Sequence, residues 1–345
     1  MKKNLVCDII GIMYVRSLCG FYSALPLMER YSTLKFFWFL PNLVYCFLNY
    51  QNVINKLNTA LFTYFKALEF FGYFSLSYYT EDIHLYEYYT FDDRVDTSRL
   101  VESYSRIRKG LACYVSLFFA AYMSIFIIFS VCAMRVEYAC LTVVFLRVYM
   151  DFGRVPVYLI VALHYCRSRA FFERMHRDLS DPASLDVKAV LQRYEILETK
   201  FTKTLGPVKC AISLFAFFGF VNIVRNQYYM TINFSESEKD YPLLACSALR
   251  IVHSVAMSFA MAWAFETISD DLNKIKHSIA NKLASAAYES RKTDLTRLLQ
   301  FLTVSPMAFS ICNVIPLNMN FPLGFLTLCI NNFICIIQLH QILSP

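Results

Sequence analysis

Long apolar runs restrict this chain more than any other feature of its sequence. The clearest one occupies residues 111–133, LACYVSLFFAAYMSIFIIFSVCA, and holds no charged side chain. A helix needs about 20 apolar residues to cross a bilayer, and irregular backbone is excluded from lipid because its polar groups lack partners there. The runs therefore predict an all-α, polytopic membrane protein.

Further runs of this kind bring the expected number of transmembrane helices to seven, and Pro41 is expected to kink the first. The composition agrees, since 57% of the residues are hydrophobic and only 17% are charged. The basic start and the interrupted apolar stretch that follows predict an interfacial helix rather than a cleaved signal peptide. The expected spans are residues 36–50, 59–79, 111–133, 138–166, 208–230, 242–266 and 321–343.

The distribution of Lys and Arg predicts the orientation. Three long polar segments, residues 80–110, 166–205 and 267–300, hold most of these side chains, and the other links hold few. Cytoplasmic loops carry the excess of basic residues, so we expect an intracellular N-terminus and an extracellular C-terminus. The sequon Asn233-Phe234-Ser235 then falls outside the cell, where Asn233 is a glycosylation candidate.

These signals divide the chain into four expected regions. Each region is defined by its hydropathy and by its charge. They are a cytoplasmic or interfacial N-terminal helix in residues 1–30, transmembrane helices one to six in 31–266 with long inner helical segments at 80–110 and 166–205, a cytoplasmic anchor segment in 267–310, and a last, pore-type helix in 311–345.

The last apolar run is unusual because it carries amides. Asn331, Asn332 and Gln338 are about two helical turns apart and share one face. Amides are costly in hydrocarbon unless they find partners or water. Two interpretations stay open: the stripe makes hydrogen bonds to neighbouring helices, or it lines an aqueous path.

Charged residues also occur inside two other expected spans. Lys66 and Glu69 are three residues apart and can pair on one helix face. Arg147, Asp151 and Arg154 form a single stripe in the fourth span. This stripe is either a functional intramembrane triad or a structural ion-pair network between helices; the second interpretation is favoured, because buried charges are usually paired.

Candidate ligand-binding residues lie in two other spans. Arg250 and His253, one turn apart in the sixth span, suit an anionic or polar ligand. Tyr122 and Phe126 in the third span can supply aromatic walls. The alternative is ordinary helix packing, with Arg250 paired to another helix.

Several functional classes are disfavoured. The twelve Cys contain no C-x-x-C pair and the six His are isolated, so we expect no metal, no cofactor and no enzymatic activity. Basic residues sit between spans, which argues against nucleic acid. A transporter often shows inverted repeats, and the sequence has no internal repeat. A pore shared by several subunits is favoured, because one seven-helix chain has little room for an aqueous path.

The plan of the chain and its last helix resemble the insect chemoreceptors, in particular the gustatory receptors. In that family the last helix carries Thr-Tyr, five hydrophobic residues and Gln-Phe. Here the matching residues are Asn331 and Asn332, then FICII, then Gln338 and Leu339. The Gln and the spacing match, and the Thr, Tyr and Phe do not. The preceding run, LLQFLTVSPMAFSICNVIPLNMNFPLGFLT, is also similar to the family.

The resemblance implies a chemosensory receptor of the plasma membrane that acts as a ligand-gated, non-selective cation channel. It implies a homo- or heterotetramer with related receptors, in contact with membrane lipid, whose last helix surrounds a central pore at Gln338. Segments 166–205 and 267–310 would form an anchor where subunits meet. A small-molecule tastant or other chemical ligand would bind in the outer half of spans two to six. The alternatives are a divergent seven-helix protein without channel activity and a membrane transporter.

Overall fold

The part of the chain that a computed structural model describes is almost entirely helical, as the apolar runs predict. The expected first span with Pro41, and most of residues 111–133, lie outside the described residues. The structure describes residues 9–18, 21, 57–80, 83–92, 95–96, 104–106, 109–110, 112–113, 116–117, 120–121, 124, 138–180, 186–235, 241–285, 289–305, 307, 309–311 and 314–343.

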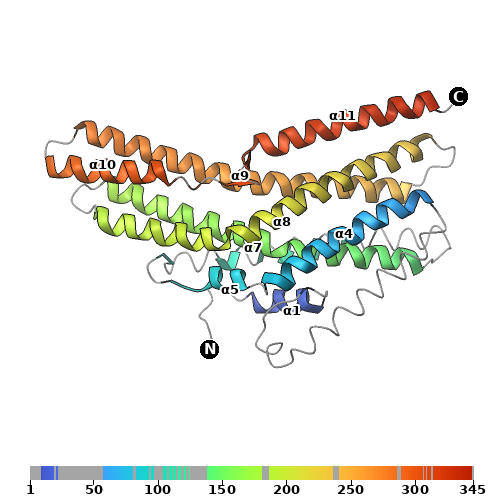
Figure 1. Cartoon of the computed structure of the whole chain (residues 1–345), viewed down its shortest axis with the longest axis horizontal. Coiled ribbons are helices and arrows are strands. Elements are labelled where there is room, and N and C mark those ends of the chain that lie inside the picture. Colours follow the sequence, from blue (N-terminus) through green and yellow to red (C-terminus); the bar gives the residue numbers. More distant parts are fainter. Residues whose placement is uncertain are drawn as a thin grey trace.

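The helices run mostly along the long axis of the molecule (Figure 1). One short antiparallel hairpin, β1 (Ser310–Ile311) with β2 (Ile315–Pro316), departs from an all-α fold. It lies where Pro316 excludes a continuous helix, just before the last span. The helices are α1 (Ile10–Leu18), α4 (Leu57–Thr80), α5 (Ile83–Tyr89), α7 (Tyr138–Ser180), α8 (Val187–Ser235), α9 (Tyr241–Ser285), α10 (Glu289–Val304) and α11 (Asn320–Leu343).

Three helices are too long to be membrane spans alone. α7, α8 and α9 have 43, 49 and 45 residues. At 1.5 Å per residue each is about 65–75 Å long, roughly twice the thickness of the hydrocarbon core. A helix of this length that crosses a bilayer must also extend well beyond it.

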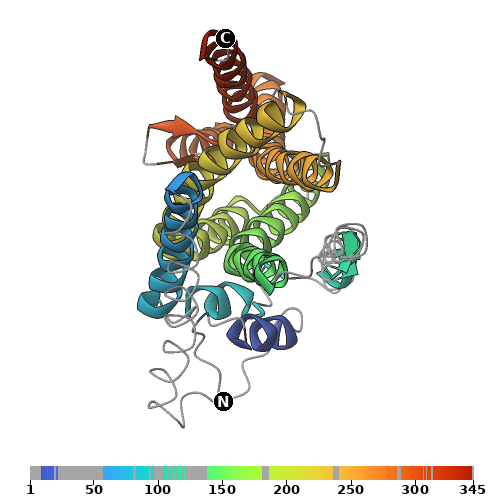
Figure 2. The same cartoon turned by 90° about the vertical axis from the view of Figure 1, so that its right-hand side faces the viewer.

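The helices define two ends of the molecule (Figure 1). At one end lie α10, the second halves of α7 and α9, and the first half of α8; we refer to it as the α10 end. At the other, the α11 end, lie α4, α11 and the remaining halves of the long helices. The end-on view shows α11 at the edge of the bundle, beside α8 and α9 (Figure 2).

The core at the α10 end follows the three- and four-residue apolar spacing of the sequence. Val190, Tyr194, Leu197 and Phe201 of α8 are all buried. They belong to one cluster with residues of α7, α9 and α10. This packing explains why a segment with many charges folds as a helix: its charged residues occupy the opposite face.

Within the described residues, three helices contain segments long and apolar enough to cross a membrane. These segments are Val187–Ile232, Ser247–Ser285 and Asn320–Leu339. α8 extends past the first of these segments and contains the sequon Asn233-Phe234-Ser235. α8 continues to Ser235, because no proline occurs between Pro207 and Pro242 to end it earlier.

Candidate functional site

α11 is the helix least covered by the rest of the chain among these three. Only 11% of its apolar window is buried, compared with 44% in α8 and in α9. Its exposed residues include Leu323, Ile330 and Leu339 as well as polar ones. An apolar helix with this little protein cover needs lipid or another protein subunit around it.

A row of small and polar side chains runs along the exposed surface of α11. Thr327, Asn331, Cys335 and Gln338 are separated by four, four and three residues, so they lie on one face. All four are exposed. Two of the predicted site residues, Asn331 and Gln338, therefore share a face that no described part of the chain covers.

Asn332, the third amide of the predicted stripe, has a different environment. It is half-buried, and its Nδ2 donates a hydrogen bond to the carbonyl oxygen of Leu328 at 2.8 Å. The side chain of Asn332 thus bonds to the backbone of its own helix. The amide stripe consists of two exposed amides and one that bonds to the backbone.

Contacts with α8 and α9 hold α11 in place. Nε2 of Gln227 donates to the carbonyl oxygen of Cys329 at 3.1 Å. The rings of Phe220 and Phe325 meet edge to face with centroids 6.0 Å apart. At the start of the helix, the backbone N–H of Met319 donates to the carboxylate of Glu266.

A buried charge cluster joins α4, α7 and α8 at the α11 end. Glu69 forms an ion pair with Arg154, and Nδ2 of Asn222 donates to Glu69 Oε2 at 3.1 Å. The guanidinium of Arg154 also lies over the ring of Phe215. The side chains of Lys66, Arg147 and Asp151 lie outside the described residues.

This cluster favours the structural interpretation of the intramembrane charges. Glu69 is fully buried and Arg154 is 3% exposed, so each needs a partner, and each has one on another helix. The predicted pair within α4, Lys66 with Glu69, stays a prediction, because the side chain of Lys66 lies outside the described residues. Spacing along one helix shows which charges share a face, but not which helix that face meets.

The candidate ligand residues on α9 are buried. Arg250 is 8% exposed and His253 is 2% exposed, and both lie on a polar stripe with Ser247, Ser254 and Ser258. The neighbouring helix α8 also carries buried polar side chains, those of Asn222, Asn226, Gln227 and Thr231.

The buried polar residues of α8 and α9 belong to the same level of the bundle. Asn226 and Arg250 are equally far along their helices from the connection between α8 and α9. Tyr122 and Phe126, the proposed aromatic walls, lie outside the described residues. Asn233 lies near the end of α8, and its side chain is also outside them.

A narrow cavity lies between α1, α4, α5, α7 and α8, with room for about one water molecule. Its lining includes Arg16, His84 and two prolines within helices, Pro156 and Pro207. Burial, and then the positive charge of Arg16, lower the pKa of His84 to about 4. The imidazole is therefore neutral at physiological pH.

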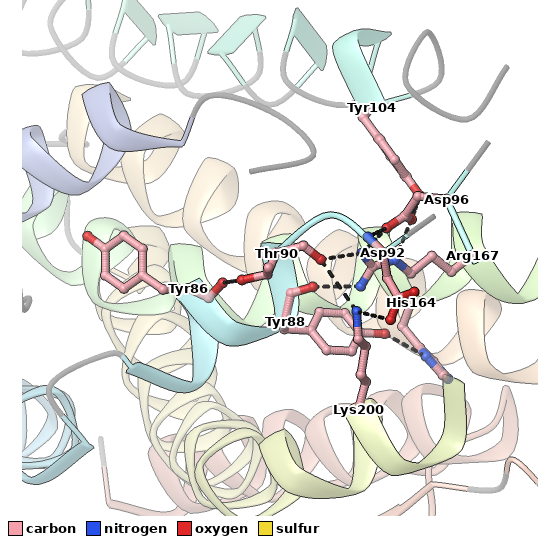
Figure 3. A network of polar contacts seen from close by, with 9 residues as sticks. All are labelled: Tyr86, Tyr88, Thr90, Asp92, Asp96, Tyr104, His164, Arg167 and Lys200. Atoms are coloured by element: carbon pink, nitrogen blue, oxygen red, sulfur yellow. Dashed lines mark hydrogen bonds and ion pairs between the residues drawn. The ribbon is translucent and has the colours of Figure 1, made fainter. Parts of the chain in front are cut away.

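A second polar network, which the sequence did not predict, holds the segment after α4 against α7 and α8 (Figure 3). Nε and Nη2 of Arg167 donate to the two carboxylate oxygens of Asp96 at 2.9 and 2.7 Å. Nη1 donates to the carbonyl oxygen of Tyr88 at 2.6 Å. Tyr104 donates its hydroxyl to Asp96 Oδ1 at 2.7 Å. Each nitrogen of the Arg167 guanidinium and each carboxylate oxygen of Asp96 thus has a hydrogen-bond partner.

The network continues on both sides of this ion pair. Nζ of Lys200 on α8 lies 3.1 Å from Oδ2 of Asp92 and forms an ion pair with it (Figure 3). The hydroxyl of Tyr88 lies 2.8 Å from Nδ1 of His164. Burial raises the pKa of Tyr88 and of Tyr104, so both hydroxyls stay protonated. The available sequence signal was a segment with both charge signs and many tyrosines next to an Arg at the end of a span.

Comparisons with known proteins find similarity in structure only. No family model matches the sequence, and no curated protein matches it. The insect olfactory receptor OR5 from Machilis hrabei superposes with a TM-score of 0.71 over 96% of this chain and 97% of that one, at 10% identity. The same receptor in complex with eugenol gives 0.67 at 9% identity, with the same coverage. The chain therefore has the fold of an insect olfactory receptor over nearly its whole length.

Proposed function

We propose that this chain is a chemosensory receptor of the gustatory type that acts as a ligand-gated, non-selective cation channel. In this proposal four copies surround a central pore lined by α11. The observation that carries it is the uncovered, apolar α11 with its row of Asn331, Cys335 and Gln338. The whole-length likeness to an olfactory receptor supports it.

We propose a pore because α11 has little protein cover and its exposed amides need water or hydrogen-bond partners. Its apolar surface needs cover, whereas the amides of its polar row need water or hydrogen-bond partners. Symmetric copies around one axis meet both needs, because apolar faces contact neighbouring helices while the polar rows face the axis. A single chain offers neither arrangement to α11.

The proposed topology has seven spans, a cytoplasmic N-terminus and an extracellular C-terminus, in the plasma membrane. The α10 end is then the cytoplasmic anchor, where subunits meet. Its helices extend beyond the thickness of a bilayer, and basic side chains gather in the same segments of the sequence. The connection between α8 and α9 then falls outside the cell, together with Asn233 near the end of α8.

The proposed ligand is a small organic molecule, as OR5 is found in complex with eugenol. It binds between the spans at the α11 end, at the level of Arg250 and His253 on α9 and of the buried polar side chains on α8. Tyr122 and Phe126 would contribute aromatic walls. Buried polar groups of this kind give orientation and specificity to an otherwise apolar pocket.

The test is a whole-cell current recording from cells that express this chain, alone and with related receptors, during application of sugars, bitter compounds and lipophilic odorants. We expect a ligand-evoked cation current whose conductance changes in Gln338→Leu. Leu339→Ile, at the next and similarly exposed position, is the matched control and should leave it unchanged. An evoked current that Gln338→Leu does not alter removes Gln338 from the pore, and silence at normal surface amounts in every combination contradicts channel function.

A further inference from the structure

Gln227 connects two helices that have different tasks in the proposed channel. It lies on α8, is 9% exposed, and donates through Nε2 to the backbone carbonyl of Cys329 on α11. The two residues are 102 positions apart in the sequence. A buried side chain that bonds to the middle of another helix fixes the position of that helix.

The acceptor lies in a stretch of α11 that has several additional hydrogen bonds to its carbonyls. Thr327 donates to the carbonyl of Leu323 at 2.9 Å, and Asn332 donates to that of Leu328 at 2.8 Å. Gln227 adds a donor to the next carbonyl, that of Cys329, at 3.1 Å. Side chains that bond to carbonyls of the helical ladder favour bending, so α11 changes direction most easily in this stretch.

α8 itself links α11 to the buried charges of the bundle. Asn222 bonds to Glu69, which pairs with Arg154, and Gln227 follows five residues later on a different face of the same helix. One face of α8 is thus bonded to α4, and another to α11. A displacement of α8 by a ligand in the bundle changes the geometry of the Gln227 contact.

The amide of Gln227 is only half satisfied. Its Oε1 is buried and has no hydrogen-bond partner among the described residues. A buried acceptor without a partner costs free energy, so an arrangement that gives Oε1 a donor competes with this one. The hydrogen bonding of this side chain can therefore improve when α11 changes its position relative to α8.

We propose that Gln227 is a positioning residue for gating: its bond to Cys329 holds α11 in the resting orientation, and the bond breaks when the pore opens. The inference rests on the proposed channel function. It assigns to one side chain the mechanical connection between the ligand-binding bundle and the pore helix.

The first arm of the test compares the dose–response curves of Gln227→Met and the wild type. Met has a similar length but no donor. Losing one hydrogen bond from the resting state should lower the half-maximal ligand concentration roughly three- to tenfold, with unchanged single-channel conductance and surface amount. Tyr228→Phe, which removes a polar group from the adjacent, partly exposed position, should not shift the curve. A lower surface amount with no shift of the curve overturns the proposal, because that is the result of a merely structural role.

The second arm needs no current. Cys329 is 2% exposed, so the reaction of its thiol with a membrane-permeant maleimide, resolved by mass spectrometry, reports how closely α11 sits against α8. Gln227→Met should increase the labelling rate of Cys329 without ligand, and Tyr228→Phe should not. Equal rates in Gln227→Met and wild type overturn the inference. A wild type without evoked current counts against the proposed channel function, while this arm still decides whether Gln227 holds α11.

Discussion

Asp96 and Arg167 form an ion pair in which neither side chain reaches solvent. Removing two charges from water is expensive, and this geometry offsets the cost with two parallel hydrogen bonds and additional donors and acceptors. The pair joins the segment after α4 to α7. It therefore holds this segment against α7 through polar contacts, in addition to the apolar packing of the long helices.

Arg167→Ala should lower the free energy of unfolding by roughly 3–5 kcal/mol, because it leaves the Asp96 carboxylate buried without its partner. Arg169→Ala is the matched control on the same helix. Its ion pair with Glu173 is exposed, and its loss should cost less than about 1 kcal/mol. Thermal unfolding of the purified protein in detergent measures both. Equal decreases in stability in the two variants would show that the buried pair of Arg167 with Asp96 stabilises the protein no more than an exposed ion pair does.

Acid should destabilise the protein through His84. Burial and Arg16 lower its folded-state pKa to about 4, from 6.5 in the unfolded chain. Above pH 6.5 the imidazole is neutral in both states, and its contribution is fully present. As the pH falls from 6.5 toward 4, only the unfolded state gains the proton, so the free energy of unfolding decreases.

The measurement for His84 is the melting temperature between pH 7 and pH 4.5. His84→Gln removes the titrating group and should make the pH dependence shallower. Parallel curves for the wild type and His84→Gln would mean that His84 does not titrate differently in the folded state.

At the residue scale the sequence showed which charges are unusual, but not their partners. Glu69 and Arg154 stood out because they interrupt apolar runs, and the structure pairs them with each other. Asp96 did not stand out, since it lies in a segment with both charge signs and no periodicity. The partner of a buried charge on another helix depends on how the helices pack, and the spacing of residues along one helix does not show this.

At the scale of the elements, periodicity was a better guide. An inner helical segment was predicted over residues 166–205, and α8 runs from within it through the expected span 208–230 without a break. The hairpin of β1 and β2 was not predicted, because two-residue strands have no periodic signal. The end of α8 was expected too early, since polar residues near Asn233 do not by themselves stop a helix.

Gly153 marks a close approach of α7 to its neighbours. A Cβ at this position would lie 2.8 Å from the ring of Phe21 and 3.2 Å from Cβ of Tyr73. Gly153→Ala should therefore displace these contacts and destabilise the protein by about 1–3 kcal/mol. Melting temperatures measure the effect.

Gly219, inside α8, is the control for Gly153, because a Cβ there meets nothing within 4 Å. Gly219→Ala should be neutral or stabilise the helix by up to about 1 kcal/mol. If Gly153→Ala behaves in the same way, α7 is not as tightly packed at that point as the structure indicates.

At the scale of the whole molecule, the long helices divide the protein into a part that fits a bilayer and a part that does not. The sequence predicted this division from its apolar runs and basic segments. It could not predict that α11 stays uncovered, because a helix shows its own polar face but not what surrounds it. The number of subunits and the ligand depend on other molecules.

The orientation of the whole molecule can be tested at Asn233. If the connection of α8 and α9 is extracellular, Asn233 receives a glycan, and the wild type shows a glycosidase-sensitive mobility shift on a denaturing gel. Asn233→Gln should abolish this shift. A wild type without any shift would remove one support of the proposed topology.

The most direct test of the central proposal is the access of water to α11 in intact membranes. Gln338→Cys and Leu339→Cys, both in a Cys335→Ser background, are treated with a water-soluble, membrane-impermeant maleimide. Position 338 belongs to the polar row, whereas Leu339 is an exposed apolar neighbour, 57% exposed in the isolated chain. If α11 lines a pore, the thiol at position 338 reacts faster than the thiol at 339. Equal rates, or faster labelling at 339, would contradict a pore along this face of α11.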